Sequence, residues 1–329
     1  PLHGVGAALC ERALAAEGAE VLTVPEQRAP DGDFPTVRFP NPEEAGALDL
    51  AEALVRASGA DVLFANDPDA DRLAAAVHVR DGGFSTIRRL SGDELGAIFA
   101  DALLEARGKS KNEQERAFVG RSLVSSELLT PIATHWGARA VETLTGFKWL
   151  WNAALVEIAK GGTYVFAYEE ALGYSVGPVV RDKDGIGAAA MLARIARSGD
   201  LLIRLYDIYE RHGYYGTRQK SVSDPAPGGL ERLKERVDAL RLAPPSTIAG
   251  FKIARTRDFQ QAQEGFPATE GVGLWLEDGT RLLVRPSGTE PKIKVYTQVV
   301  EPWSDRAEAR AQERIAVLEQ AGVALLRDI

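Results

Sequence analysis

The stretch Asp67-Pro68-Asp69-Ala70-Asp71-Arg72 places three carboxylates at alternate positions and an arginine directly after them. Apolar, strand-like segments flank it, at 62–65 and 73–77. Three aspartates on one short loop repel each other unless a cation lies among them. Oxygen ligands in this number suit Mg²⁺, Mn²⁺ or Ca²⁺. Arg72 adds a planar guanidinium that can hold a phosphate beside the metal.

Other interpretations of this loop stay open to different degrees. A solvated acidic turn is the plainest alternative. A calcium-binding EF-hand loop needs glycine at its sixth position and glutamate at its twelfth, where this chain has Arg72 and His78. Phosphatases with an aspartate nucleophile also begin with two aspartates separated by one residue, so such an enzyme, with Asp67 as nucleophile, remains an alternative.

A second candidate loop, Arg285-Pro286-Ser287-Gly288-Thr289-Glu290-Pro291-Lys292, lies between apolar segments predicted to be strands. It offers two cations, two hydroxyls and backbone N–H groups around Gly288. A concave set of such donors suits a phosphate dianion. An ordinary two-residue hairpin turn needs no such density of donors, so we predict a phosphate-binding loop.

A third loop, Tyr168-Glu169-Glu170-Ala171-Leu172-Gly173-Tyr174, follows another apolar strand. Adjacent carboxylates can accept hydrogen bonds from sugar hydroxyls, and a solvated tip is an equal alternative. Lys148 and Lys183 stand at predicted junctions between a loop and a helix. Lysines there can neutralise a substrate phosphate or act as acid or base, although surface lysine is the ordinary alternative.

Composition limits the class of protein. The 329 residues, 45% of them hydrophobic, suit two or three globular domains. A formal net charge of -8 argues against nucleic acid as a partner. No run of about 18 apolar residues predicts a membrane span, and no signal peptide is visible. Cys10 is the only cysteine, which fits a reducing compartment, so we expect a cytoplasmic protein.

The order of strands and helices predicts an α/β fold. Two segments, 59–67 and 161–169, share a glycine, an apolar strand ending in Phe-Ala, and an acid, and similar helices follow both. We therefore predict two related α/β units with mixed, mostly parallel sheets, at 1–114 and 115–213, and a smaller α+β domain at 214–329. Chance similarity is the alternative to the repeat. The turn at Gly4-Val5-Gly6 normally follows a strand, which we expect before Pro1.

Together these motifs resemble the α-D-phosphohexomutase superfamily, the phosphoglucomutases and phosphomannomutases. The segments 67–72, 169–171 and 285–291 are similar to its metal, sugar-binding and phosphate-binding loops, in the right order. Three further segments, 1–6, 145–148 and 182–185, are similar to secondary motifs. The family carries its phosphoserine in a first domain, followed by His-Asn-Pro, and no Ser-His dipeptide occurs here. The resemblance therefore implies that this first domain is absent and that the chain by itself is inactive.

The resemblance also implies a reaction and a role for each candidate residue. Phosphate would move between C1 and C6 of a hexose through a hexose 1,6-bisphosphate intermediate, with an upstream phosphoserine as donor. Mg²⁺ would bind Asp67, Asp69 and Asp71, and Arg72, Lys183 and Lys148 would assist catalysis. Glu169 would hold sugar hydroxyls. The non-reacting phosphate would contact Arg285, Ser287, Gly288 and Thr289.

One position departs from the family pattern. The sugar loop often reads Glu-x-Ser, and Ala171 takes the place of the serine. This resembles a branch that includes phosphopentomutases, so glucose, mannose and pentose phosphates all stay open as substrates. The alternatives to a mutase are the aspartyl-phosphate phosphatase and a phosphosugar-binding fragment without turnover.

Overall fold

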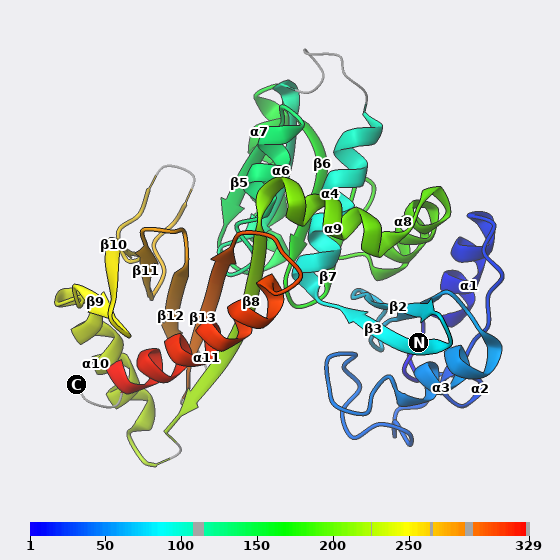
Figure 1. Ribbon diagram of the computed structural model, residues 1–329, viewed down its shortest axis with the longest axis horizontal. Helices are drawn as coiled ribbons and strands as arrows, with labels where there is room; N and C mark the ends of the chain where they lie inside the picture. The colour runs from blue at the N-terminus through cyan, green and yellow to red at the C-terminus, as the bar shows by residue number, and fades with distance from the viewer. Residues whose placement is uncertain (108–114, 225, 264–265, 287–291, 327–329) are drawn as a thin grey trace. The chain divides into compact units, whose positions relative to one another are not determined.

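The chain separates into two compact units, Pro1–Ile208 and Tyr209–Ile329 (Figure 1). The computed structural model describes residues 1–107, 115–224, 226–263, 266–286 and 292–326. Each unit has its own sheets and its own buried apolar core. The three predicted domain ranges stay predictions. Among the described residues, no helix is both long and apolar enough to cross a membrane.

The first unit begins with helices and a three-stranded sheet. The helices are α1 (Ala7–Ala16), α2 (Pro25–Arg28) and α3 (Asp49–Ser58). The strands are β1 (Val62–Ala65), β2 (Ala74–Asp81) and β3 (Phe84–Leu90), paired in that order and antiparallel throughout. The Asp67–Arg72 loop joins β1 to β2, as predicted.

A four-stranded sheet forms the rest of the first unit, in the order β5-β4-β6-β7. Its strands are β4 (Ala117–Ser122), β5 (Arg139–Thr143), β6 (Thr163–Glu169) and β7 (Gly173–Val176). The β4 strand pairs in parallel with β5 and β6, and β7 returns antiparallel to β6. The helices are α4 (Gly92–Ala106), α6 (Leu129–His135), α7 (Phe147–Ala159), α8 (Gly185–Ser198) and α9 (Leu201–His212).

Helices cover both faces of this sheet because alternate residues of β6 point to opposite sides. Phe166 packs against Phe99 of α4, and Tyr168 lies over Gly96 of the same helix. Ala167 instead joins a buried cluster with residues of α7. The carboxyl end of β6 therefore leaves the sheet between two helical layers, at the loop that carries Glu169.

The second unit is an α+β domain, as predicted. Its antiparallel sheet has the order β8-β13-β12-β11-β10-β9. The strands are β8 (Tyr214–Ser223), β9 (Thr247–Ile248), β10 (Phe251–Asp258), β11 (Val272–Leu276), β12 (Arg281–Pro286) and β13 (Lys292–Glu301). Helix α10 (Gly229–Leu242) packs against β11, β12 and β13, and α11 (Ala307–Leu325) packs against β8 and β13 (Figure 1).

The mixed α/β class is confirmed, but the first predicted unit is not mostly parallel among the described strands. Its β1 and β2 are joined by only the short acidic loop, and parallel neighbours need a crossover of a dozen or more residues. Helix α4, which the repeat assigned to the first sheet, packs on β6 of the second sheet. The segment 20–24, between α1 and α2, forms no regular strand.

Candidate functional site

The three aspartates of the loop after β1 converge. One carboxylate oxygen from each of Asp67, Asp69 and Asp71 lies within 4.8 Å of the others. Asp67 is buried, Asp71 is partly exposed and Asp69 is exposed. Burial, and then the nearby charges of Asp71 and Asp69, raise the pKa of the Asp67 carboxyl. The loop therefore concentrates negative charge at a place that is open to solvent on one side.

The backbone of this loop is held from behind by the turn at Gly4-Val5-Gly6. The Val5 N–H donates to the Pro68 carbonyl at 2.9 Å. A Cβ on Gly4 would lie 2.3 Å from the same carbonyl oxygen, and one on Gly6 would lie 2.5 Å from the Ala70 Cβ. Side chains at these two glycines would push the loop away, so the turn and the acidic loop form one packed element.

Two cations lie against the carboxylates. The Arg72 backbone N–H donates to Asp67 Oδ1 at 3.0 Å, and its Nε lies 3.3 Å from Asp67 Oδ2. Lys183 Nζ lies 2.8 Å from Asp71 Oδ2. Lys183 reaches the loop from the segment just before α8, where Asp184 caps the helix through the Gly187 N–H. Two of the three predicted catalytic cations therefore meet the predicted metal loop.

The acidic loop is joined directly to the loop after β6. Arg72 forms a β-bridge with Gly173, and the Leu73 N–H donates to the Leu172 carbonyl at 3.0 Å. A Cβ on Gly173 would lie 2.7 Å from Lys183 Cδ. The strand-end positions that the repeat placed in correspondence are therefore neighbours in space.

Glu169 ends β6, and its Oε1 accepts a hydrogen bond from the Gly146 N–H at 2.5 Å. Burial raises the pKa of its carboxyl. The bond fixes Glu169 at the N-terminus of α7, where Lys148 is exposed and lies 5.5 Å from the centre of the Trp149 ring. Ala171 is exposed two residues further along. Within the described part of the chain, Lys148 forms no ion pair with Asp67, Asp69 or Asp71.

Sequence reasoning missed a buried polar cluster behind this loop. Glu170 Oε2 accepts from Ser125 Oγ at 3.0 Å and from Ser122 Oγ at 3.3 Å, and both serines are fully buried. Nearby, Asp93 Oδ1 accepts from Tyr168 Oη at 2.9 Å. Burial, and then the charge of Asp93, raise the pKa of Glu170 to about 7. The pair Glu169-Glu170 was the available signal, but only the structure separates their roles.

The predicted phosphate loop lies in the second unit. Arg285 is partly exposed near the end of β12, at the register position opposite Lys294 of β13. The other predicted residues of this loop, Ser287, Gly288 and Thr289, lie outside the described residues. The strand predicted before this loop is therefore present, and it extends through Arg285 to Pro286.

The donor set of the acidic loop fits a hard divalent cation. Three carboxylate oxygens, converging on one point with a solvent-facing side, suit the oxygen preference of Mg²⁺ and leave room for further oxygen ligands. Soft metals prefer sulfur ligands, and no such ligand belongs to this cluster.

Comparison with known proteins gives the same family for three successive parts of the chain. Models of the phosphoglucomutase/phosphomannomutase family match three ranges: α/β/α domain II at 1–82, α/β/α domain III at 91–212 and the C-terminal domain at 249–318. A probable phosphomannomutase of Haemophilus influenzae is 40% identical over 304 residues, covering 90% of this chain and 58% of that protein. A probable phosphoribomutase of Schizosaccharomyces pombe is 38% identical over 322 residues, covering 90% of this chain and 53% of that protein.

Solved structures agree with the fold. A phosphoglucomutase/phosphomannomutase family protein from Burkholderia thailandensis superposes with a TM-score of 0.67 at 20% identity, covering 98% of this chain and 59% of that one. The chain spans about half the length of the curated relatives it matches. With three family models covering successive parts of it, the chain belongs to the phosphoglucomutase/phosphomannomutase family, the α-D-phosphohexomutase superfamily.

Proposed function

We propose that this chain is the metal- and substrate-binding part of a phosphomutase that interconverts a hexose 1-phosphate and a hexose 6-phosphate through a hexose 1,6-bisphosphate. The convergence of Asp67, Asp69 and Asp71 with Arg72 and Lys183 carries the proposal. It supplies what phosphoryl transfer needs from a protein, namely positioning and compensation of charge.

The three aspartates would hold Mg²⁺, which, when bound, offsets negative charge on a transferring phosphoryl group. Arg72 would direct its guanidinium to phosphate oxygens beside the carboxylates. Lys183, held at Asp71, would lie close enough to neutralise phosphate charge or pass a proton. Lys148, with its exposed side chain, is free to turn toward a substrate phosphate.

Glu169 would accept hydrogen bonds from sugar hydroxyls through its second oxygen, because its Oε1 is held by the Gly146 N–H. Arg285, with Ser287, Gly288 and Thr289, would bind the non-reacting phosphate of the sugar. The phosphoserine that donates the phosphoryl group would come from outside this chain. We therefore expect residues 1–329 alone to bind phosphosugars without turning them over.

A pentose phosphate is the second candidate substrate. Two observations favour it: alanine at position 171 of the sugar loop, and relatives described as a probable phosphoribomutase and as phosphopentomutases. A methyl group cannot donate the hydrogen bond that a serine hydroxyl would give to a sugar oxygen. The site therefore selects less strongly for a sugar oxygen at this position.

The phosphatase alternative is less well supported by the geometry. A nucleophilic aspartate needs an accessible oxygen, whereas Asp67 is 6% exposed and both its oxygens lie against Arg72. The intact mass of the protein, measured after exposure to acetyl phosphate, distinguishes a phosphatase from a mutase. A phosphate adduct on Asp67 that Asp67→Asn removes would establish the phosphatase.

Calorimetric titration with glucose 6-phosphate, mannose 6-phosphate and ribose 5-phosphate in Mg²⁺ tests the proposal. Arg285→Ala should weaken binding by about tenfold to a hundredfold, since a bond to a charged group contributes about 1.5–3 kcal/mol. Lys252→Ala, at an exposed cation of the same sheet, is the matched control. Equal affinity in wild type and Arg285→Ala would contradict the phosphate assignment, and turnover of glucose 1-phosphate by the chain alone would contradict an external phosphoserine.

A further inference from the structure

His3 lies in the turn that supports the acidic loop, and its backbone is strained. Leu2 and His3 have φ values of 46° and 59°, in the left-handed region. Residues other than glycine rarely adopt this region, although histidine does so more often than most. His3 is also only 3% exposed. Such a conformation persists only where the surrounding structure enforces it, and it occurs most often at functional sites.

The segment 27–36 holds His3 from one side. The Nε2 of His3 lies 2.8 Å from Thr36 Oγ1, which also accepts a hydrogen bond from Gln27 Nε2 at 2.9 Å. The His3 N–H donates to the Gln27 carbonyl at 3.0 Å, and the His3 carbonyl accepts from the Asp31 N–H at 3.0 Å. The ring, the N–H and the carbonyl of one residue are therefore all fixed by this segment.

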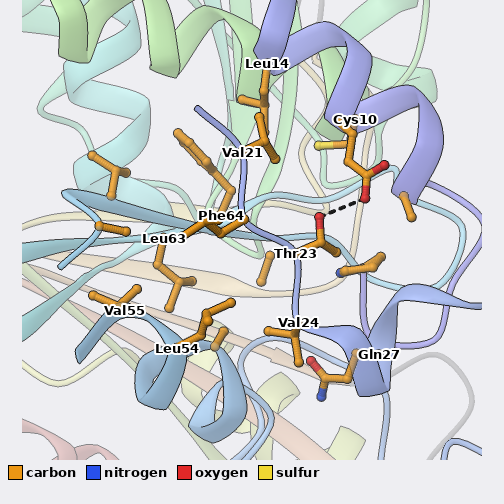
Figure 2. A pocket seen from close by; sticks show the side chains of 18 of the residues that line it. Cys10, Leu14, Val21, Thr23, Val24, Gln27, Leu54, Val55, Leu63 and Phe64 are labelled. Carbon is orange, nitrogen blue, oxygen red and sulfur yellow. Dashed lines mark hydrogen bonds between the residues drawn. The ribbon is translucent and has the colours of Figure 1, made fainter. Parts of the chain in front are cut away.

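The segment that carries Gln27 is in turn anchored on α1. Glu11 of that helix accepts a hydrogen bond from Thr23 Oγ1 at 2.7 Å, and from Arg28 Nε and Nη2 at 2.8 Å each. Thr23 and Gln27 both line an apolar cavity of the first unit, and the dashed line in Figure 2 marks the bond of Thr23. Gln27 is buried, so its amide holds Thr36 from a fixed position.

The other side of the turn packs against the middle of the acidic loop. A Cβ on Gly6 would lie 2.5 Å from the Ala70 Cβ, so the two backbones are in close contact. Ala70 is itself left-handed, with a φ of 60°, and its N–H donates to the Asp67 carbonyl at 3.0 Å. Because a Cβ disfavours this conformation, the turn helps to hold Ala70, and with it the aspartates on either side.

We propose that His3 is a positioning residue for the acidic loop. Its ring, bound to Thr36, holds the left-handed turn at 2–6 in the arrangement in which Asp67, Asp69 and Asp71 converge. This role of His3 rests on the proposed binding of Mg²⁺ by the three aspartates. His3 acts on the metal through the turn rather than by contact.

Mn²⁺ binding by the full chain, measured by water-proton relaxation, tests this role. His3→Gly removes the ring, while glycine adopts the left-handed conformation without strain, and Thr36→Val removes only a hydroxyl. We expect Mn²⁺ to bind at least tenfold more weakly in His3→Gly, as for other residues that orient metal ligands, and severalfold more weakly in Thr36→Val. Thr36 is exposed, so Thr36→Val decides the question even if His3→Gly does not fold.

The matched control is Thr134→Val. It removes a hydroxyl that donates to the Thr130 carbonyl of its own helix, α6, and it should keep the wild-type affinity for Mn²⁺. A merely structural role of His3 would lower the urea midpoints of His3→Gly and Thr36→Val and leave the Mn²⁺ affinity of the folded protein unchanged. That result would overturn the proposal.

The double variant tests whether Thr36 acts through the His3 ring. If it does, Thr36→Val should weaken Mn²⁺ binding in the wild-type chain and have no further effect in His3→Gly. An equal weakening in both backgrounds would overturn the proposal.

Hydrogen exchange without metal gives a second readout, which does not depend on binding. Peptides covering 67–73 should exchange severalfold faster in His3→Gly and Thr36→Val, while β4 and β6 serve as internal references. Unchanged exchange across 67–73 in both variants would contradict the positioning role. Absence of Mn²⁺ binding by the wild type would overturn the proposed metal site and this role with it, whereas equal Mn²⁺ binding by the wild type and both variants would overturn only the role of His3.

Discussion

Two clusters of carboxylates lie within the first unit, and they offset the repulsion between their negative charges in opposite ways. The acidic loop after β1 keeps Asp67, Asp69 and Asp71 close together, on a side open to solvent and against the cations Arg72 and Lys183. The cluster behind β6 places Glu170 and Asp93 among buried hydroxyls. The first cluster is suited to bind a further cation. In the second cluster, burial and the charge of Asp93 raise the pKa of Glu170 to about 7, which favours the protonated carboxyl.

The difference shows that crowded carboxylates are not by themselves a metal site. An oxygen held by a serine hydroxyl inside the protein has neither the room nor the solvent path that a hydrated cation needs. Oxygens that converge at a partly exposed loop have both.

The largest effect should come from Glu170→Gln. The folded-state pKa of about 7 lies above the ordinary value of 4.5, so the folded protein holds a proton that the unfolded chain has lost. Stability therefore falls as pH rises from 4.5 through 7, at a cost on the order of 3 kcal/mol at pH 8. The neutral amide should remove most of this fall, so that urea midpoints at pH 5 and pH 8 converge.

The control for this measurement is Glu44→Gln, at an exposed side chain of the same unit, which should keep the wild-type pH dependence. If Glu170→Gln also keeps the wild-type pH dependence of stability, the buried carboxyl is not protonated. The two clusters would then not differ in how they offset their charge.

Asp69→Asn should act on metal binding instead. Removing one carboxylate charge from the convergent set should weaken Mn²⁺ or Mg²⁺ binding by at least tenfold, and toward a hundredfold, as measured by calorimetry or by Mn²⁺ relaxation. Asp69 is exposed, so stability without metal should change by less than about 0.5 kcal/mol. Asp61→Asn, at an exposed aspartate paired with Arg80, is the control, and equal weakening there would point to non-specific charge.

Ser125→Ala should destabilise the buried cluster by roughly 1–2 kcal/mol, because Glu170 loses a hydrogen-bond donor inside the protein. That bond lowers the pKa of Glu170, so the loss should be greater at pH 8 than at pH 5. Urea unfolding at both pH values measures it. Ser85→Ala, at an exposed hydroxyl of β3, serves as comparison; a loss independent of pH would mean that the serine acts through packing alone.

The smallest effect should come from Lys183→Met. The pair with Asp71 is partly exposed, so its loss should cost less than about 1 kcal/mol of stability. Removing a positive charge beside the carboxylates should strengthen divalent-metal binding severalfold in the absence of substrate. Weaker metal binding in this variant would indicate that Lys183 shapes the loop rather than competing with the metal.

The sequence determined the class of fold and the chemistry of the acidic loop. Alternation of carboxylates between two apolar segments is a local property, and the strands on either side were placed correctly because their apolar runs are continuous. The position of Arg285 near the end of β12 was likewise predictable, because Pro286, Ser287 and Gly288, which follow it in the sequence, are residue types common in turns. The antiparallel pairing of β1 with β2, by contrast, follows from the short loop between them. The similarity between segments 59–67 and 161–169 had led us to expect mostly parallel strands there.

Only the tertiary structure decided which groups lie next to each charged side chain. Glu169 and Glu170 are adjacent in sequence, yet one carboxylate accepts from the Gly146 backbone at the start of α7 and the other from Ser125, 45 residues away in the chain. Lys183 and Asp71 likewise meet across more than 100 residues. Burial and long-range contacts set the pKa of a carboxyl, and neither can be read from the residues beside it. The sequence therefore identified the groups that carry charge, and the packing of the two sheets determined which of them lie beside cations and which are buried among hydroxyls.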